Sequence, residues 1–423
     1  MTEMLSKVGE QIFHARVSAV AAAALAADFS RHPGPKHGIV VCADPESPVL
    51  TAAVDALAPP DSLTVVAGKG ADKIRDHIRL AGAWVQERVS VVEALAEAEA
   101  ADAIILADLV TGGAEETRVE LEQLARSLAQ GGTISVAVAA APFLAGGAGE
   151  ELDRQATLFG VGSDLVLRNM PPVRVHRLRF TPAPVELAER LSPLPRTSSV
   201  RLTPDVHIDS SGVVAAGLLL GAAALVKRAR PHSKAWLIPA LATGPVAAFF
   251  RDPERAVPED PKAIVAASDG KVLGVERLRD DRLGDEEFLR IAVFLSVLDV
   301  HVNRSPVAGR VVDHFVADGG FAAAMKPEAE HNVAGYTVLE TRYGTVAVAQ
   351  RTGLIARRIV QRAPVGALLA KGERLGLIRF GSRTDVYLPA DAAVATVAPG
   401  DRVAGGETVI AHWTRVPQRL SGG

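Results

Sequence analysis

The sequence of 423 residues has little of what several functional classes require. Its single cysteine, Cys42, excludes an intrachain disulfide, and without histidines and cysteines clustered at ligand spacing we expect no metal site. Aromatic residues make up only 4% of the chain and are not interleaved with a basic stripe. Because the formal net charge is also only −3, we do not expect nucleic acid to be a partner.

Hydrophobic residues, by contrast, make up 48% of the chain, so alanine, valine and leucine must do most of the packing. The length predicts two or three domains. The alanine-rich run Val17–Ala27 mimics the apolar part of a signal peptide, but Glu3 and Glu10 stand where positive charges belong. We therefore predict an ordinary first helix there, in a protein of a reducing compartment.

Short β-branched runs alternate with helical stretches in the first part of the chain. This alternation predicts a doubly wound α/β, Rossmann-like domain over residues 1–180. The expected strands are GIVVCA from Gly38, SLTVVAG from Ser62, VSVVEA from Val89, AIILADLV from Ala103 and GGTISVAVA from Gly131.

The stretch Glu120–Val138, ELEQLARSLAQGGTISVAV, resembles the helix, Gly-Gly turn and strand of Rossmann-type methyltransferases. Such enzymes need a glycine-rich turn after the first strand, where the backbone approaches the cofactor. Here that turn, Cys42–Glu46, reads CADPE and has no glycine. We therefore predict a degenerate, non-catalytic methyltransferase-like domain, with residual ligand binding as the alternative.

A stretch rich in proline and serine, residues 181–205, is predicted to be a linker. The next segment, residues 206–260, holds two uncharged apolar runs, Val213–Val226 and Ala235–Phe250. The turn between them is basic and contains Lys227, Arg228, Arg230 and Lys234. At about 1.5 Å per residue, such runs cover roughly 20–24 Å, less than a hydrocarbon core of about 30 Å. Two interpretations stay open: a helical hairpin buried in the core, or one that dips into a membrane with its basic turn near anionic headgroups.

Residues 261–423 read as a compact β-rich domain, because turn signals separate short strands about every 8–12 residues. Within it the segment Gly372–Pro389, GERLGLIRFGSRTDVYLP, runs from one strand through Gly381-Ser382 into a second strand. A Gly-Ser pair alone indicates only a turn. Four other segments give it a context, in the order FFRDPER from Phe249, ASDGKV from Ala267, FLSVLDVHVNRSP from Phe294 and RTGLIARRIV from Arg351.

As an ordered set, these five segments closely resemble the short-form (type II) phosphatidylserine decarboxylase proenzymes, over residues 211–413. The resemblance implies that the chain cuts itself between Gly381 and Ser382 and converts Ser382 into a pyruvoyl group, which is the cofactor. It implies decarboxylation of phosphatidylserine to phosphatidylethanolamine in phospholipid biosynthesis, by a large and a small chain of the same precursor. It also implies a peripheral protein of an anionic membrane, on the cytoplasmic face of the cell membrane. A homo-oligomer is compatible with the sequence, which does not fix the oligomeric state.

Decarboxylation of an amino acid needs an electron sink beside the amine, and the resemblance implies a ketone made from the backbone in that role. The Ser382 hydroxyl would attack the carbonyl of Gly381, whose missing side chain admits the close approach. The resemblance implies His301 as the base that takes the serine proton and Asp269 as the carboxylate that orients it. Taken alone, Asp269 reads as a turn residue before Gly270, and His301 as a structural histidine.

Two positions depart from the family's pattern. Longer members have a second histidine three positions after the first, where this chain has Arg304. Either His301 serves in processing, or Arg304 acts electrostatically. The short form commonly carries Asn-Glu-Arg-Asn, where this chain reads Ala329-Glu330-His331-Asn332, so His331 puts a phosphate-binding role of that turn in doubt.

Other functions fit these residues less well. The segment VAPGDRVAGGETVIA from Val397 resembles the second half of a biotinyl or lipoyl carrier, but no lysine follows Lys371 to accept such a group. A pyruvoyl decarboxylase of a related lipid, such as archaetidylserine, or of a small amino acid is the alternative that stays open. The apolar hairpin favours a lipid.

Overall fold

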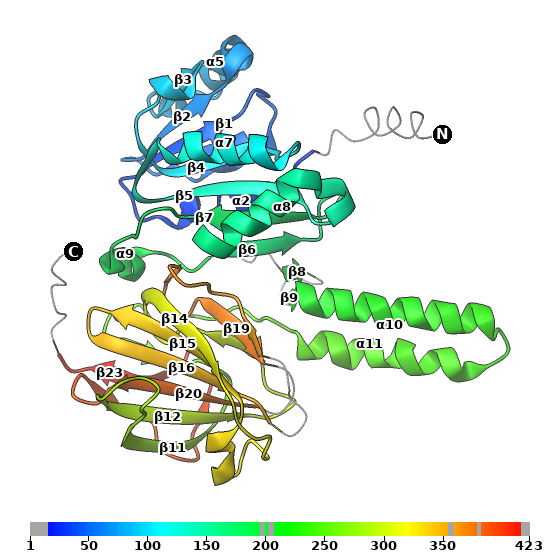
Figure 1. The fold of residues 1–423 in the computed structure, drawn as a ribbon, viewed down its shortest axis with the longest axis vertical. Coiled ribbons are helices and arrows are strands. Elements are labelled where there is room, and N and C mark those ends of the chain that lie inside the picture. Colours follow the sequence, from blue (N-terminus) through cyan, green and yellow to red (C-terminus); the bar gives the residue numbers. More distant parts are fainter. Residues whose placement is uncertain (1–15, 195–198, 202–206, 354–358, 379–381, 416–423) are drawn as a thin grey trace. The chain divides into compact units, whose positions relative to one another are not determined.

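The computed structural model describes residues 16–194, 199–201, 207–353, 359–378 and 382–415 (Figure 1). The chain divides into two compact units, Met1–Pro182 and Ala183–Gly423. Each unit has buried hydrophobic clusters of its own.

A mixed sheet forms the centre of the first unit. Within the described residues its seven strands lie in the order β3-β2-β1-β4-β5-β7-β6, with parallel pairing from β3 to β5 and antiparallel pairing of β7 with β5 and β6. The predicted doubly wound α/β arrangement is confirmed. The strands are β1 (His37–Val41), β2 (Ser62–Val66), β3 (Val89–Val92), β4 (Ala101–Leu109), β5 (Leu128–Ala139), β6 (Gly160–Val166) and β7 (Val173–Leu178).

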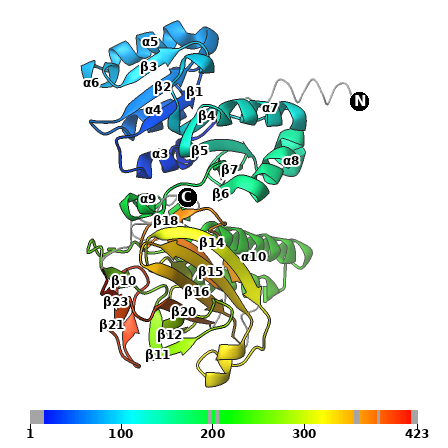
Figure 2. The ribbon, with the colours of Figure 1, turned by 60° about the vertical axis from the view of Figure 1, so that its left-hand side comes forward.

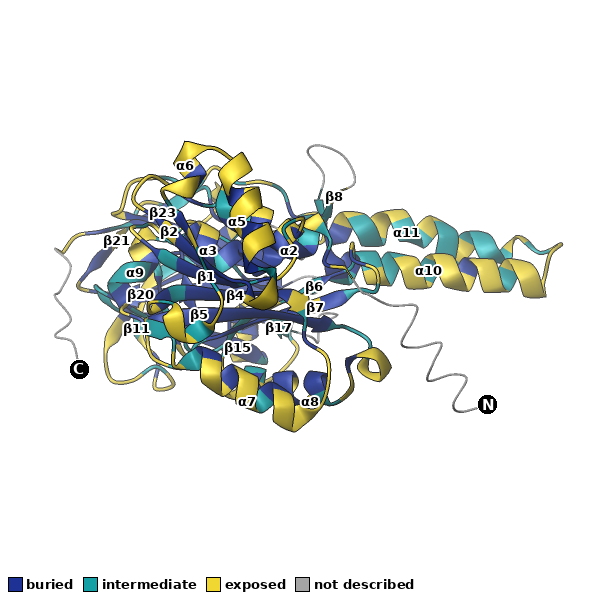
Figure 3. Cartoon of the chain, turned by 90° about the horizontal axis from the view of Figure 1, so that it is seen from above, coloured by how far each residue is buried: buried dark blue, intermediate teal, exposed yellow. Residues whose placement is uncertain are grey.

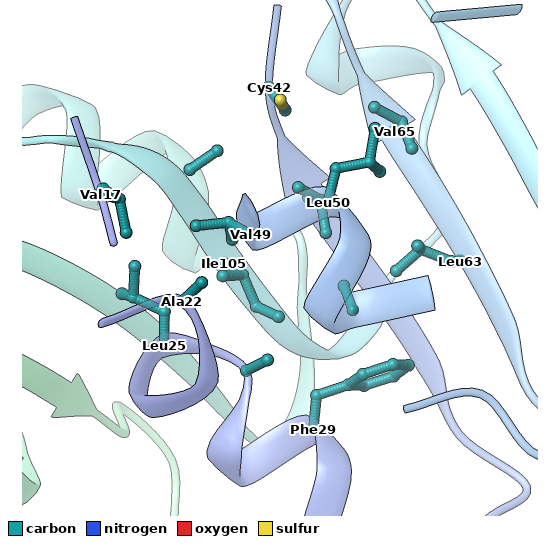
Figure 4. Close-up of a cluster of buried hydrophobic side chains, with 14 of the residues drawn as sticks. Val17, Ala22, Leu25, Phe29, Cys42, Val49, Leu50, Leu63, Val65 and Ile105 are labelled. Atoms are coloured by element: carbon teal, nitrogen blue, oxygen red, sulfur yellow. The ribbon is translucent and has the colours of Figure 1, made fainter. Parts of the chain in front are cut away.

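Helices cover this sheet with their apolar faces. Helix α2 (Ala19–Leu25) begins at Ser18, whose side chain accepts a hydrogen bond from the Ala21 amide. Leu25 is buried with Phe29 and Ile105 in the cluster of Figure 4, so the run Val17–Ala27 contains an ordinary helix that packs in the core of the first unit. The remaining helical segments are α3 (Ala27–Arg31), α4 (Pro48–Asp55), η1 (Gly68–Gly70), α5 (Ala71–Leu80), α6 (Ala83–Gln86), η2 (Leu95–Glu97), α7 (Ala114–Ala125) and α8 (Pro142–Phe159).

The turn after β1 packs closely against the segment after β2. A Cβ atom on Gly70 would lie 2.6 Å from the carbonyl oxygen of Ala43, so the two backbones are in contact. Ser47 then caps α4 by accepting a hydrogen bond from the Val49 amide. The two backbones therefore meet at the carboxyl ends of β1 and β2, where methyltransferases have a glycine-rich turn beside the cofactor. This packing supports a degenerate domain, which stays a prediction.

The second unit is mostly antiparallel β-structure (Figure 2), and the predicted β-rich domain is confirmed. Among the described residues, its largest sheet has the order β18-β14-β15-β16-β20-β12-β11-β22, and smaller sheets have the orders β13-β19-β17, β10-β23-β21 and β8-β9. The strands are β8 (Ser199–Arg201), β9 (His207–Asp209), β10 (Ala263–Val265), β11 (Gly270–Arg279), β12 (Glu287–Leu295), β13 (Val302–Arg304), β14 (Gly309–Ala317), β15 (Ala334–Thr341), β16 (Gly344–Arg351), β17 (Ile359–Gln361), β18 (Leu368–Leu369), β19 (Arg374–Ile378), β20 (Ser382–Pro389), β21 (Ala393–Ala395), β22 (Arg402–Val403) and β23 (Val409–Trp413). A short helix, η4 (Pro327–His331), precedes β15.

Two long helices form the predicted hairpin. Helix α10 (Ser210–Ala229) is capped by Asp209, whose carboxylate accepts from the Ser211 amide, and α11 (Leu237–Phe249) returns after the short η3 (Lys234–Trp236). Most of the hairpin faces outward (Figure 3): Leu218 is 71% exposed and Ile238 is 75% exposed. Of the two interpretations, a hairpin buried in the core is therefore wrong. The 20 residues of α10 make it about 30 Å long, which exceeds the apolar run seen in the sequence.

Part of the predicted linker is ordered structure of the second unit. Helix α9 (Val185–Arg190) packs Ala188 against Leu368, and β8 pairs with β9. Residues 195–198 and 202–206 lie outside the described residues. The division between Pro182 and Ala183 thus assigns α9 to the second unit.

The segment FFRDPER contributes a buried carboxylate that ties the base of the hairpin to the sheets. Asp252 accepts hydrogen bonds from Arg304 at 3.0 Å and from Arg374 at 2.6 Å. Arg304 also donates to the carbonyl oxygens of Gly372 and Pro253. Asp252 and Arg304 are both almost fully buried, so the ion pairs of Asp252 with Arg304 and Arg374 neutralise charge inside the second unit.

We expect Asp252→Ala to destabilise the second unit by about 3–5 kcal/mol, because it removes the buried carboxylate that pairs with both Arg304 and Arg374. Denaturant unfolding of the full chain measures this. The control is Glu259→Ala, an exposed acidic residue of the same segment. Equal midpoints for the two variants would show that the carboxylate does not hold this region together.

Candidate active site

Ser382 is the first residue of strand β20, in the middle of the large sheet. It is fully buried and lies opposite Leu295 of β12. Its Oγ atom has no hydrogen-bond partner in the described part of the chain. Residues 379–381 are outside the described residues, so Gly381, the other half of the predicted cleavage pair, is not placed.

A polar cluster surrounds this face of β20. Thr384 is on the same face as Ser382, two positions along the strand, and Gln350 of β16 lies opposite Thr384. The Gln350 Nε2 atom donates to Asn303 Oδ1 at 2.7 Å, which joins β16 to β13. Thr384 Oγ1, Gln350 Oε1 and Asn303 Nδ2 are all buried, and none has a partner among the described residues.

His301 lies two residues before Asn303 and is fully buried. Its Nδ1 atom is 2.8 Å from the carbonyl oxygen of Asp299, which can only accept, so Nδ1 carries the ring proton. The other nitrogen, Nε2, is therefore a free acceptor, and it is buried without a partner in the described structure. The ring of Phe249, at the end of α11, lies with its centroid 4.1 Å from that of the imidazole.

Burial lowers the pKa of His301 below its ordinary value of about 6.5, and the Asp299 carbonyl only partly opposes this effect. The imidazole is therefore neutral at pH 7. A neutral ring whose Nε2 lone pair is free can take a proton from a hydroxyl.

Asp269 does not orient His301 through a direct contact, which corrects the sequence-based expectation. Its carboxylate accepts two hydrogen bonds from Arg255 Nη2, at 2.7 and 2.8 Å, and one from the Gly405 amide at 2.8 Å. The carbonyl of Asp299 takes the orienting position instead. Asp269 still acts on His301 at longer range, since its negative charge raises the pKa of the imidazole.

The opposite face of β20 holds an ionic network. Asp385 and Arg351 are both fully buried, and Arg351 Nε donates to the Asp385 carboxylate at 2.7 Å. Arg383 donates to the same carboxylate, and Arg351 also donates to the hydroxyls of Tyr336 and Tyr387. Burial alone would raise the pKa of the Asp385 carboxyl, but Arg351 and Arg383 together hold it below its ordinary value. Alternation along β20 thus puts charge on one face and neutral polar groups on the other.

Two further sequence features have structural explanations. Arg304 is engaged with Asp252 and with backbone carbonyls, so it is a structural cation at the hairpin base. In the turn AEHN, Asn332 bridges the backbone of Ala322 and Thr352, whereas His331 is exposed. Arg351 opens the segment RTGLIARRIV, of which residues 354–358 lie outside the described residues.

The residues around Ser382 fit the pyruvoyl group that the resemblance implies. A carbonyl group at this position would sit at the start of β20, on the buried polar face that Thr384 and Gln350 share. Five side chains of β20, β16 and the segment His301–Asn303 keep polar atoms without partners in the described part of the chain: His301, Asn303, Gln350, Ser382 and Thr384. Buried unpaired groups cost about 1–3 kcal/mol each, so a cluster of them indicates a functional site.

Sequence reasoning missed Asn303, Gln350 and Thr384 as members of the site. Alternation carried a signal for two of them, because Asn303 shares a strand face with His301 and Thr384 shares one with Ser382. Gln350 directly precedes the segment RTGLIARRIV, but only the pairing of β16 with β20 brings it to the serine.

Comparison with known proteins assigns this site to one family. The family model described as "Phosphatidylserine decarboxylase" matches residues 244–411. The phosphatidylserine decarboxylase proenzyme of Symbiobacterium thermophilum is 48% identical over 172 residues, which are 40% of this chain and 78% of that protein. The proenzyme of Erythrobacter litoralis is 42% identical over 211 residues, which are 46% of this chain and 84% of that protein.

Several of the similar solved structures are methyltransferases. A putative O-methyltransferase from Klebsiella pneumoniae has a TM-score of 0.29 and 14% identity, and covers 39% of this chain and 82% of its own. The O-methyltransferase from Bacillus cereus has a TM-score of 0.29 and 12% identity, and covers 41% of this chain and 88% of its own. Likeness at this level carries no conclusion about activity.

We expect the imidazole of His301 to titrate below pH 6.5, because burial disfavours its charged form. The measurement is the pH dependence of its ring proton resonances in the uncut variant Ser382→Ala. Adding Phe249→Ala should raise the pKa, since removal of that ring admits water to the imidazole. A pKa above 6.5 before that change would contradict the structure.

Proposed function

The chain belongs to the phosphatidylserine decarboxylase proenzyme family, and on that premise we propose that it cuts itself between Gly381 and Ser382 and carries its pyruvoyl group at position 382. Enzymes of this family act as decarboxylases of phosphatidylserine in phospholipid biosynthesis, and this chain is one of them. The observation that carries the proposal is the set of buried polar atoms without partners in the described structure, among them Ser382 Oγ and His301 Nε2. The Asn303–Gln350 hydrogen bond joins the two segments that carry them, because Asn303 follows His301 by two residues and Gln350 lies opposite Thr384.

Cleavage requires Ser382 to act on its own peptide bond. Its Oγ attacks the carbonyl carbon of Gly381, the bond from that carbon to the Ser382 nitrogen breaks, and an ester replaces the amide. Loss of the Cα proton of Ser382 then expels the Gly381 carboxylate from its Cβ and leaves a dehydroalanine. Water hydrolyses this group, releasing ammonia and leaving a pyruvoyl group at the start of the small chain.

His301 is the proposed base for this sequence. Its Nδ1 proton is held by the Asp299 carbonyl, so the Nε2 lone pair is available for the serine proton. Because burial keeps the ring neutral at pH 7, no proton has to be removed first. Asp269, held by Arg255, is proposed to favour the imidazolium that forms, by its charge rather than by a hydrogen bond.

Decarboxylation then uses the same residues. The pyruvoyl carbonyl supplies the electron sink for the departing carboxylate. His301 Nε2 is proposed to take a proton from the substrate ammonium group and then to deliver it to the substrate α-carbon, a step worth about 10²–10⁴-fold in rate. Asn303, Gln350 and Thr384 offer neutral donors and acceptors for the headgroup at the same cluster.

The position of β20 explains how the two chains stay together after cleavage. Strand β20 pairs with β16 on one side and with β12 on the other, so the small chain supplies a central strand. The buried pair of Arg351 and Asp385 joins the two chains across that strand. We therefore propose that the small chain remains bound without a covalent link.

Decarboxylases of this family are associated with membranes, and the hairpin is the proposed contact. Helix α10 is long and apolar enough to cross a membrane, and only 17% of its apolar stretch is buried. At the far end Lys227, Arg228, Arg230 and Lys234 are exposed, where they attract anionic headgroups. We propose that the protein is peripheral on the cytoplasmic face of the cell membrane.

We expect Ser382→Ala to remain one chain and to release no carbon dioxide from phosphatidylserine, because the attacking oxygen is gone. His301→Ala should slow cleavage by about 10²-fold or more. The controls are Ser163→Ala and His314→Ala, which replace exposed residues. Gel electrophoresis and carbon dioxide release measure both steps. Full processing of Ser382→Ala would show that Ser382 is not the attacking residue. Normal processing of His301→Ala would show that another residue is the base.

We expect charge reversal at Lys227, Arg228 and Arg230 to weaken co-sedimentation with anionic vesicles, at about 1 kcal/mol for each residue near the surface. High salt should weaken binding of the wild type in the same assay. Reversal at Lys271, Arg277 and Arg279 of β11, all exposed, is the matched control. Unchanged binding of the hairpin variant would contradict this membrane contact.

A further inference from the structure

The turn Ser296–Asp299 exposes two aliphatic side chains close to the active site. Val297 is 55% exposed and Leu298 is 83% exposed. The turn is well ordered, because the Asp299 carboxylate accepts from the Ser296 amide at 2.7 Å and the Asp299 amide donates to the Ser296 carbonyl at 3.0 Å. Two large apolar side chains are thus exposed to solvent on a hydrogen-bonded turn.

The same turn is attached to the base of the hairpin. Arg251, two residues after the end of α11, donates to the Leu298 carbonyl and, at 3.1 Å, to the Ala248 carbonyl. Because one guanidinium holds both segments, Leu298 lies beside the last turn of α11. The exposed aliphatic pair therefore lies at the base of the hairpin.

A direct link also runs from this turn to the proposed base. The Asp299 carbonyl accepts the hydrogen bond from His301 Nδ1 at 2.8 Å, and Phe249 of α11 packs on the same ring. The residue that ends the turn thus fixes the tautomer of the imidazole. Because Leu298 directly precedes Asp299, a surface that Leu298 contacts lies close to His301.

The charges around the turn are suited to an anionic surface. Arg402 pairs with the Asp299 carboxylate at 3.2 Å while its side chain is 73% exposed, and Arg251 lies on the hairpin side. Arginines beside exposed aliphatics are the pattern of a segment that enters the headgroup region. A protein partner is disfavoured, because two side chains bury far less area than a stable protein interface needs.

We propose that the turn Ser296–Asp299 is a second membrane contact, in which Val297 and Leu298 enter the interface of an anionic bilayer beside the hairpin. This contact sets the entrance of the active site at the depth of the headgroups, so that a lipid reaches His301 without leaving the membrane. The inference rests on the proposed function, since it gives the decarboxylase site its orientation toward the lipid.

The test uses the processed full chain and vesicles of phosphatidylcholine with phosphatidylserine. We expect Leu298→Asp to weaken vesicle binding about tenfold, because a buried leucine contributes about one order of magnitude or more to such transfer. The bulk lipid concentration that gives half the maximal rate should rise by a similar factor. Leu298→Trp should retain binding, since tryptophan favours the interface. The control is Val394→Asp, at a 54% exposed valine of β21 in the same unit.

Each outcome separates this inference from the proposed function. Cleavage into two chains, measured before lipid is added, shows that a variant folds. The vesicle rate of Leu298→Asp should fall more than its rate on a soluble short-chain phosphatidylserine. Equal losses on both substrates, or vesicle binding equal to that of Val394→Asp, would overturn the membrane contact. Failure of the wild type to cleave or to decarboxylate would instead overturn the proposed function.

Discussion

The buried pair of Arg351 and Asp385 is the interaction on which the second unit depends. Both side chains are fully buried, and they join β16 to β20 at the centre of the largest sheet. Removing one partner of such a pair typically costs about 3–5 kcal/mol, because the other charge is left without compensation. The pair therefore fixes the strand that begins with Ser382, and it does so from the face that the serine does not use. A strand held in this way can lose its covalent link to the preceding residue and keep its register.

The other face of β20 carries neutral polar atoms, and His301, two residues before Asn303, has no partner for its Nε2 in the described structure. Phe249 of α11 packs on the imidazole of His301, and Arg251 joins the end of α11 to the carbonyl of Leu298. The hairpin that we propose as the membrane contact therefore also supports the proposed base.

Much of the fold follows from the sequence, because periodicity and turn residues are local signals. The strand runs of the first unit, the hairpin and the short strands of the second unit were all predictable. The identity of the site came instead from five ordered motifs that resemble one family. The Asn303–Gln350 bond was not predictable, since it joins residues far apart in sequence through the registers of two sheets. The sequence also could not show that the Asp299 carbonyl, and not the Asp269 carboxylate, bonds to His301. The Asp269 carboxylate is bound by Arg255 and by the Gly405 amide, and Gly405 is far from it in the sequence.

The intact mass of the purified wild-type chain tests the central claim most directly. The account predicts two chains, one of residues 1–381 and one of residues 382–423 whose first residue is a pyruvoyl group and carries no amine. They should separate under denaturing conditions and migrate together under native ones. A single chain of 44.3 kDa that nevertheless releases carbon dioxide from phosphatidylserine would contradict the account.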